Sequence, residues 1–182
     1  MVLNLFALVW GFAEATVFFI LPDVWISLVA VTRGTRAGLI ACFWAVAGAL
    51  AGGTVMYFWS AGMPELVTAI LDMQPAVGPQ LVGAVRQELS ASGVTALVAG
   101  TFSGVPYKLY AAQAMHIDPP LPLALFLVAS LASRLTRFLL VAIIVGWIGT
   151  NWARELRKRT AVLTLLLLWA AYYTVYFTVL PD

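Results

Sequence analysis

Charged residues are scarce in this chain of 182 residues: Lys, Arg, Asp and Glu make up 10% of it, whereas 63% of the residues are apolar. A water-soluble domain carries about 25% charged residues and roughly half apolar ones. The composition therefore excludes a soluble globular domain and predicts an integral membrane protein. Ten basic and eight acidic residues give a net charge of +2, which is too weak a basic balance for a nucleic-acid-binding protein.

Cysteine and histidine are nearly absent, with one residue of each, Cys42 and His116. A single cysteine excludes an intrachain disulfide, and one cysteine with one histidine cannot form a zinc site. Because the usual nucleophilic and metal constellations are missing, we expect no metal, no cofactor and no enzymatic activity. The opening MVLNLF lacks the basic start of a secretory signal peptide, so we expect the first apolar segment to stay in the protein.

Three apolar stretches are long enough to cross a bilayer, for which a helix needs about 20 apolar residues. They are 38–59, 121–149 and 160–181. Two further apolar regions, 2–32 and 93–115, are interrupted by prolines and charged residues. The first is too long for one crossing and too short for two, and a proline inside a helix removes a hydrogen bond. We therefore predict two re-entrant helical hairpins whose turns pack against protein. The turns are expected at Pro22 and at Gly104 with Pro106.

Basic residues suggest an orientation, because Lys and Arg in short loops mark the cytoplasmic side. Arg33 and Arg36 follow the first predicted hairpin, and a basic loop precedes the last span. The loop consists of Arg154, Arg157, Lys158 and Arg159 with their neighbours. The segment 60–92 is acidic on balance, which fits the outer side. Leu81, Val85 and Leu89 recur there at helical spacing, which predicts an amphipathic helix along the membrane interface.

The predicted fold is thus an all-α membrane protein with a single polytopic domain, residues 1–182. It consists of a first hairpin and span (1–59), an external loop with an interfacial helix (60–92), a second hairpin and span (93–149), and a basic loop with a last transmembrane helix (150–182). Because the first hairpin opens inward and the second outward, the two halves form an inverted repeat. Interrupted segments in corresponding halves are typical of transporters with a site at the membrane midplane.

Small residues line the first predicted span. Gly48 and Gly52 form a GxxxG pattern, with Ala45, Ala49 and Gly53 beside it. Such spacing lets two helix backbones approach closely. The pattern therefore predicts a helix-packing face.

Five ionisable side chains fall in or near the apolar segments. They are Glu14, Asp23, Lys108, Arg134 and Arg137. A charge at the centre of a membrane helix costs about 2.5–3.5 kcal/mol on insertion scales, so these groups must be paired, hydrated or close to the interface. Both arginines share a helix face with Ser130 and Ser133, since the four positions follow the i, i+3, i+4, i+7 spacing. This polar stripe must face protein or water.

The sequence allows two interpretations of these five ionisable side chains. In the functional one, the hairpin turns and the stripe surround a polar cavity. There Arg134, Arg137 and Lys108 bind an anionic headgroup, because a guanidinium suits phosphate, and Glu14 or Asp23 exchanges a proton during transport. In the structural one, the two carboxylates are permanent ion-pair partners of the two arginines. For Lys108 there is a separate alternative, in which a lysine close to a segment end snorkels to the headgroups.

Three stretches of sequence carry a resemblance to a known family. AEATVFFILPD at 13–23 and GALAGGTVMYFWSAG at 48–62 resemble an acidic first hairpin and the Gly-rich span after it in the DedA family, part of the VTT (SNARE-associated Golgi protein) superfamily. FSGVPYKLYAAQAM at 102–115, followed by SLASRLTRFLLVAIIVGWIG at 130–149, is similar to that family's second hairpin and arginine-bearing span. The chain looks most like the small YqaA-like branch of the family.

The resemblance implies two re-entrant hairpins in inverted repeat and the transport of membrane lipids. Family members are associated with flipping or scrambling phospholipids, with recycling undecaprenyl phosphate and with the proton gradient. By motif position, Glu14 and Asp23 correspond to the acidic hairpin residues of the family, and Arg134 and Arg137 to its basic ones. Pro106 with Lys108 matches the turn of its second hairpin.

We accordingly expect a transporter, flippase or scramblase of the bacterial inner membrane that moves a phospholipid or a polyprenyl phosphate. Its partners would be membrane lipids and protons, and no nucleic acid. The residues leave two alternatives open. One is a proton-coupled transporter of a small soluble anion or drug-like ion, and the other is a membrane scaffold that transports nothing.

Overall fold

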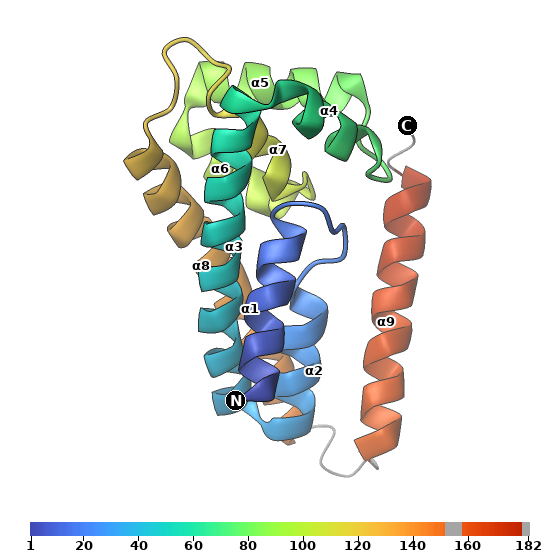
Figure 1. The fold of residues 1–182 in the computed structure, drawn as a ribbon. Helices are drawn as coiled ribbons and strands as arrows, with labels where there is room; N and C mark the ends of the chain where they lie inside the picture. The colour runs from blue at the N-terminus through green and yellow to red at the C-terminus, as the bar shows by residue number, and fades with distance from the viewer. Residues whose placement is uncertain (152–157, 180–182) are drawn as a thin grey trace.

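The computed structural model of this protein describes residues 1–151 and 158–179, and this part of the chain is helical, without strands. Figure 1 shows its arrangement. The helices are α1 (Val2–Glu14), α2 (Asp23–Arg33), α3 (Thr35–Gly62), α4 (Pro64–Asp72), α5 (Pro79–Ser92), α6 (Val94–Ser103), α7 (Tyr107–Gln113), α8 (Leu123–Asn151) and α9 (Lys158–Val179). The all-α prediction is confirmed. Of the predicted basic loop, Arg154 and Arg157 lie outside the described residues.

Three of these helices, α3, α8 and α9, are long and apolar enough to cross a membrane. They correspond to the three spans predicted from the sequence. Many large apolar side chains on them are exposed, among them Phe43, Leu131 and Leu167. An apolar surface of this extent requires an apolar surrounding. The exposed surface and the amino-acid composition therefore both indicate a membrane protein.

The first interrupted region forms two antiparallel helices joined by residues 15–22 (Figure 1). Glu14 is the last residue of α1, and the amides of Val17 and Phe18 close that helix end by donating to the carbonyl of Ala13 at 2.8 and 2.7 Å. Pro22 immediately precedes α2. Proline suits this position because the first amides of a helix have no partner within it.

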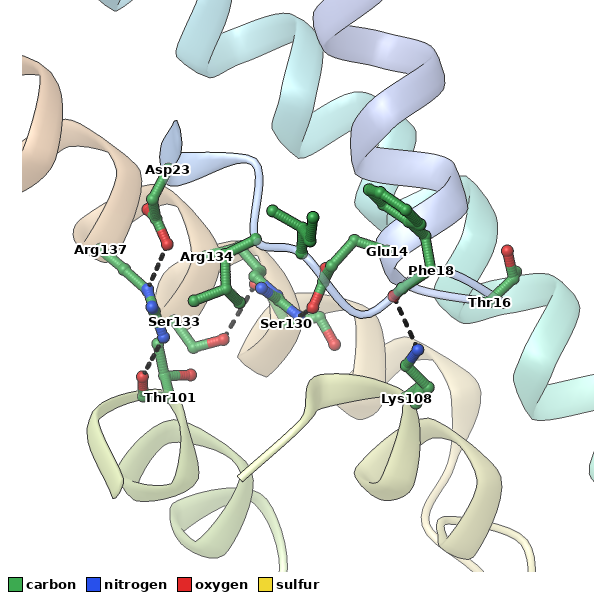
Figure 2. Close-up of polar contacts among 12 residues, drawn as sticks. Glu14, Thr16, Phe18, Asp23, Thr101, Lys108, Ser130, Ser133, Arg134 and Arg137 are labelled. Atoms are coloured by element: carbon green, nitrogen blue, oxygen red, sulfur yellow. Dashed lines mark hydrogen bonds and ion pairs between the residues drawn. The ribbon is translucent and has the colours of Figure 1, made fainter. Parts of the chain in front are cut away.

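The second interrupted region also forms two helices, α6 and α7, joined by a turn with a proline directly before the second helix. Gly104 ends α6 with a left-handed backbone, φ 86°, which glycine adopts without strain. Pro106 then precedes α7. The turn between α6 and α7 and the turn between α1 and α2 face each other, with the arginines of α8 beside them (Figure 2).

Close backbone contact joins α1 to α3. A Cβ atom on Gly48 would overlap the carbonyl oxygen of Leu8, and one on Gly52 would lie 2.6 Å from that of Phe12. Gly11 of α1 contacts Ala45 in the same way. The GxxxG pattern is therefore a packing face, as predicted, and it positions the end of α1 that carries Glu14.

Helices α4 and α5 occupy the predicted external loop and lie across one end of the bundle (Figure 1). The predicted amphipathic helix corresponds to α5, and its place along the membrane interface stays a prediction. Val85 and Leu89 are buried, and they belong to the apolar cluster that contains residues of α7. Arg86 also donates to Gln113 of α7 at 2.9 Å. The apolar residues of α5 thus face protein.

Enlarging Gly48 tests the contact between α1 and α3. We expect Gly48→Ala to destabilise the protein by about 1–3 kcal/mol, the usual effect of overpacking, because the added Cβ meets backbone that cannot move aside. The matched control is Gly83→Ala, in α5, where a Cβ meets no atom within 4 Å and should stabilise the helix by about 0.5–1 kcal/mol. Thermal unfolding in detergent micelles measures both, and equal midpoints for the two variants would contradict the packing.

Candidate functional site

The five ionisable side chains predicted from the sequence lie together, where the two turns meet α8 (Figure 2). Glu14, Asp23, Lys108 and Arg134 are almost fully buried, each at most 2% exposed. The side chain of Arg137 is 20% exposed. Residues that are far apart in the sequence thus form one buried polar cluster.

Arg134 pairs with Glu14. Its Nη2 atom lies 3.0 Å from Oε1 of the carboxylate. The guanidinium carbon also lies 4.2 Å from the ring centroid of Tyr107 at the start of α7, and 5.8 Å from that of Phe138. Such cation–π contacts add to the stability of a desolvated cation. Arg134 therefore joins the end of α1 to the second turn.

Arg137 pairs with Asp23. Its Nε atom donates to Oδ2 at 2.9 Å, and its Nη1 atom donates to the carbonyl oxygen of Thr101 at 2.8 Å. Asp23 opens α2 and Thr101 belongs to α6. One side chain thus holds both helix pairs, and the two carboxylates compensate the two guanidinium groups one to one.

Lys108 differs from the arginines, because within the described residues its ammonium forms no ion pair. Nζ donates to the carbonyl oxygen of Phe18 at 2.7 Å and to Oε1 of Gln74 at 2.8 Å. An ammonium has three donors, so these two contacts leave one N–H. The lysine is 1% exposed and bound to the first turn, so the snorkelling alternative is wrong.

The serines of the predicted stripe are buried, at 0% for Ser130 and 1% for Ser133. Ser133 donates to the carbonyl oxygen of Ser130 at 3.1 Å. The stripe therefore faces protein. Several buried polar atoms in this region have no hydrogen-bond partner within the described part of the chain, namely Glu14 Oε2, Asp23 Oδ1, Tyr107 Oη, Ser130 Oγ and Arg134 Nε. Since buried polar atoms are normally bonded, this group of atoms indicates a site for polar molecules.

A cavity of about 40 Å³ adjoins the cluster. Its walls come from both turns, from α8, from α9 and from the segment between α4 and α5. The charged residues on them are Glu14, Lys108, Arg134 and Arg137. The volume suffices for roughly three water molecules, so polar molecules of that size fit beside the buried charges.

The side chains of α9 that reach the cavity were not identified as site residues from the sequence. Tyr173 Oη accepts from the amide of Leu21 at 2.8 Å, and Tyr176 donates to the carbonyl oxygen of Gly104 at 3.2 Å. Trp169 does not line this cavity, but on the same face of α9 it donates to Oγ of Ser27 at 3.0 Å. With Tyr172 these residues follow the i, i+3, i+4, i+7 spacing, which is the signal that could have revealed them.

Gln74 is another site residue that sequence reasoning missed. It lies between α4 and α5, accepts from Lys108 and donates through Nε2 to the carbonyl oxygens of Val17 at 2.9 Å and Ile70 at 3.2 Å. No periodic pattern marks an isolated glutamine in a connecting segment.

Ligands for a metal ion do not gather at this site. In residues 1–151 and 158–179 no group of three or more His, Cys, Asp and Glu side chains could hold one. His116 instead lies 3.0 Å from the carbonyl oxygen of Ser60 through Nε2.

Removing either partner of the Glu14–Arg134 ion pair should destabilise the protein, and removing Arg134 should destabilise it more than neutralising Glu14. Arg134→Met leaves a carboxylate buried without a counter-charge, so we expect a loss of about 3–5 kcal/mol. Glu14→Gln keeps an oxygen that accepts from Nη2 and should cost less. In the double variant Glu14→Gln, Arg134→Met neither charge remains, so it should unfold at a higher temperature than Arg134→Met alone. Additive losses in a thermal unfolding cycle would show that the two side chains do not interact.

Comparison with known proteins gives one distant relative and no family assignment. An uncharacterized protein of Haemophilus influenzae is 29% identical to this chain over 168 residues, which cover 87% of this chain and 82% of the relative. No family model matches the sequence. No solved structure matches it either. The chain is thus similar along most of its length to a protein whose own activity is not described.

Proposed function

We propose that this chain is a membrane transporter, flippase or scramblase that moves a lipid with an anionic headgroup, and that Lys108 supplies the charge that binds the headgroup. One observation carries the proposal. Within the described residues, the two carboxylates of the cluster pair with the two arginines, whereas the buried ammonium beside the cavity contacts only neutral oxygens. A buried charge without a counter-charge is unfavourable, and the phosphate oxygen of a lipid would compensate it.

The lengths of the short helices support a transporter architecture. α1 has 13 residues and α6 has 10, which corresponds to about 20 and 15 Å, whereas the hydrocarbon core measures about 30 Å. Neither helix can cross alone. We propose that α1–α2 and α6–α7 are re-entrant hairpins in inverted repeat, as in the DedA family that the sequence resembles, and that their facing turns lie near the membrane midplane.

We further propose that Glu14 couples transport to protons, because in the part of the chain that the structure describes its side chain has an unpartnered oxygen beside the cavity. One carboxylate oxygen binds Arg134 and the other, Oε2, has no partner within the described residues. Glu14 also lines the cavity. This oxygen, next to space for water, is the geometric feature on which we base the coupling role. We propose a location in the bacterial inner membrane and assign the protein no enzymatic step. The relative from Haemophilus influenzae supports only the bacterial part of this proposal.

Replacing Lys108 tests the headgroup site without breaking an ion pair. In liposomes with fluorescent phospholipid and polyprenyl-phosphate probes, we expect Lys108→Gln to reduce movement of the anionic probes at least tenfold and to affect zwitterionic probes less. Loss of one charge-assisted hydrogen bond, about 1.5–3 kcal/mol, corresponds to roughly that factor. The matched control is Lys158→Gln, at an exposed position of α9, with insertion of all samples equalised.

Two results would redirect the assignment. If wild-type protein moves no lipid but carries a small anion into the vesicles, the soluble-ion alternative replaces lipid transport. If it carries nothing above empty liposomes, the scaffold alternative does. Arg134 and Arg137 are less suitable for this experiment, because each is bound in an ion pair and its removal affects folding as well as binding.

Neutralising Glu14 tests the proton coupling. Glu14→Gln should still fold, because the amide oxygen accepts from Arg134, but transport by the variant should no longer respond to a pH gradient across the liposome. Initial rates are measured with and without the gradient, alongside Glu65→Gln on the exposed side of α4 as the control. A gradient response that persists in folded Glu14→Gln would reject Glu14 as the coupling group.

A further inference from the structure

The side chain of Gln74 lies where three parts of the molecule meet. Its amide oxygen accepts from the ammonium of Lys108, and its amide nitrogen donates to the carbonyl oxygen of Val17 in the first turn. Gln74 itself belongs to the segment 73–78 between α4 and α5 and lines the cavity. This one side chain therefore both occupies a donor of the buried cation and attaches the segment to the first turn.

An amide oxygen is a modest partner for an ammonium. Hydrogen bonds in which donor and acceptor are both charged are shorter and stronger than those with a neutral partner. A phosphate at Nζ would therefore accept from the N–H that the two contacts leave and, through a second oxygen, compete with Gln74 for Lys108. The remaining contact of Nζ is the backbone carbonyl of Phe18, which is fixed by its turn, so the exchangeable partner is the glutamine.

The cavity also requires a movable wall. At about 40 Å³ it holds a few water molecules, and a phosphate with a lipid attached needs more space. Arg134 and Arg137 are held in their ion pairs. The segment 73–78 has no ion pair to hold it within the described residues. Ala76 and Val77 are buried, whereas Met73 is 81% exposed. Ala76 has a left-handed backbone, φ 61°, which an alanine adopts only where its surroundings impose it, so release of the segment would relax this strain.

We infer that Gln74 occupies the anion position on Lys108 in the unliganded protein, and that a phosphate oxygen displaces it and thereby releases the segment 73–78 from the cavity. The inference rests on the proposed anion site and adds to it a specificity-determining residue and a mechanism of opening. The ligand is recognised as a phosphate oxyanion, whether it belongs to a lipid headgroup or to free phosphate.

Hydrogen–deuterium exchange of residues 73–78 tests this inference in the full-length protein reconstituted in phosphatidylcholine vesicles. Addition of phosphatidic acid should increase the exchange of this segment severalfold in the wild type and leave it unchanged in Lys108→Gln. Gln74→Leu should exchange rapidly without anionic lipid, because it cannot hold the segment. Gln74→Glu should exchange slowly with or without it, because its carboxylate pairs with Lys108. Gln87→Glu, at an exposed position of α5, is the matched control and should behave as the wild type.

A further sample contains inorganic phosphate and no phosphatidic acid. If phosphate alone releases the segment, displacement by an oxyanion is supported and its source is free phosphate. If only phosphatidic acid does so, the source is the lipid. The inference is overturned if neither changes the exchange of 73–78, if Gln74→Glu responds as the wild type does, or if the response persists in Lys108→Gln.

The readout is independent of transport, so the two proposals can fail separately. Wild-type protein that releases the segment on binding phosphatidic acid but moves no lipid would disprove lipid transport and retain the role of Gln74. Protein that moves anionic lipid while the exchange of 73–78 stays constant would retain transport and disprove the role of Gln74.

Discussion

Compensation of buried charge is the constraint on which the rest of this structure depends. Arg134 and Arg137 lie about one helical turn apart on α8, and each receives a carboxylate from a different helix of the first pair. Arg137 also binds the carbonyl oxygen of Thr101 on α6. In apolar surroundings the first turn cannot leave α8 without exposing an uncompensated charge, and departure of the second turn would remove a carbonyl acceptor of Arg137 and the ring that lies against Arg134. Since lipid offers little hydrophobic drive for helix association, these polar contacts determine where the turns lie.

Charge compensation requires backbone geometry that is accurate to a fraction of an ångström, and small residues supply it. The absence of side chains at Gly48 and Gly52 lets α1 lie directly against α3. This contact places Glu14, the last residue of α1, within hydrogen-bond distance of Arg134. The glycine face and the ion pair therefore act together, because the first provides the position at which the second can form.

Features with a local signature could be predicted from the sequence, and features that depend on three-dimensional pairing could not. Apolar length located the long helices, proline located the turns, and the cost of charge in a membrane singled out the five ionisable residues. The partner of each arginine depends on how α1 and α2 rotate against α8, which no local pattern encodes. Lys108 was open to a snorkelling interpretation because its carbonyl acceptor lies 90 positions away.

The tyrosines of α9 show why a visible pattern does not by itself reveal a role. With Trp169, the residues Tyr172, Tyr173 and Tyr176 follow the same spacing as the polar stripe of α8. Tyrosine is common at membrane interfaces, so the spacing is equally compatible with interfacial anchors and with a wall of the site. The structure distinguishes the two roles by the acceptors and donors that these hydroxyl groups meet in the two turns.

The helices that line the cavity differ in the strength of the interactions that attach them to the two turns. α8 is attached by charge, whereas the polar contacts of α9 with the turns and α2 are bonds of uncharged Tyr and Trp side chains, each worth about 0.5–1.5 kcal/mol net. The outer surface of α9 is apolar, with Leu163, Leu167 and Val175 exposed. If the proposed lipid transport is correct, the side of α9 is therefore the direction in which the site would open sideways into the bilayer, and a molecule with one polar end would enter there while its hydrocarbon tail never leaves the membrane.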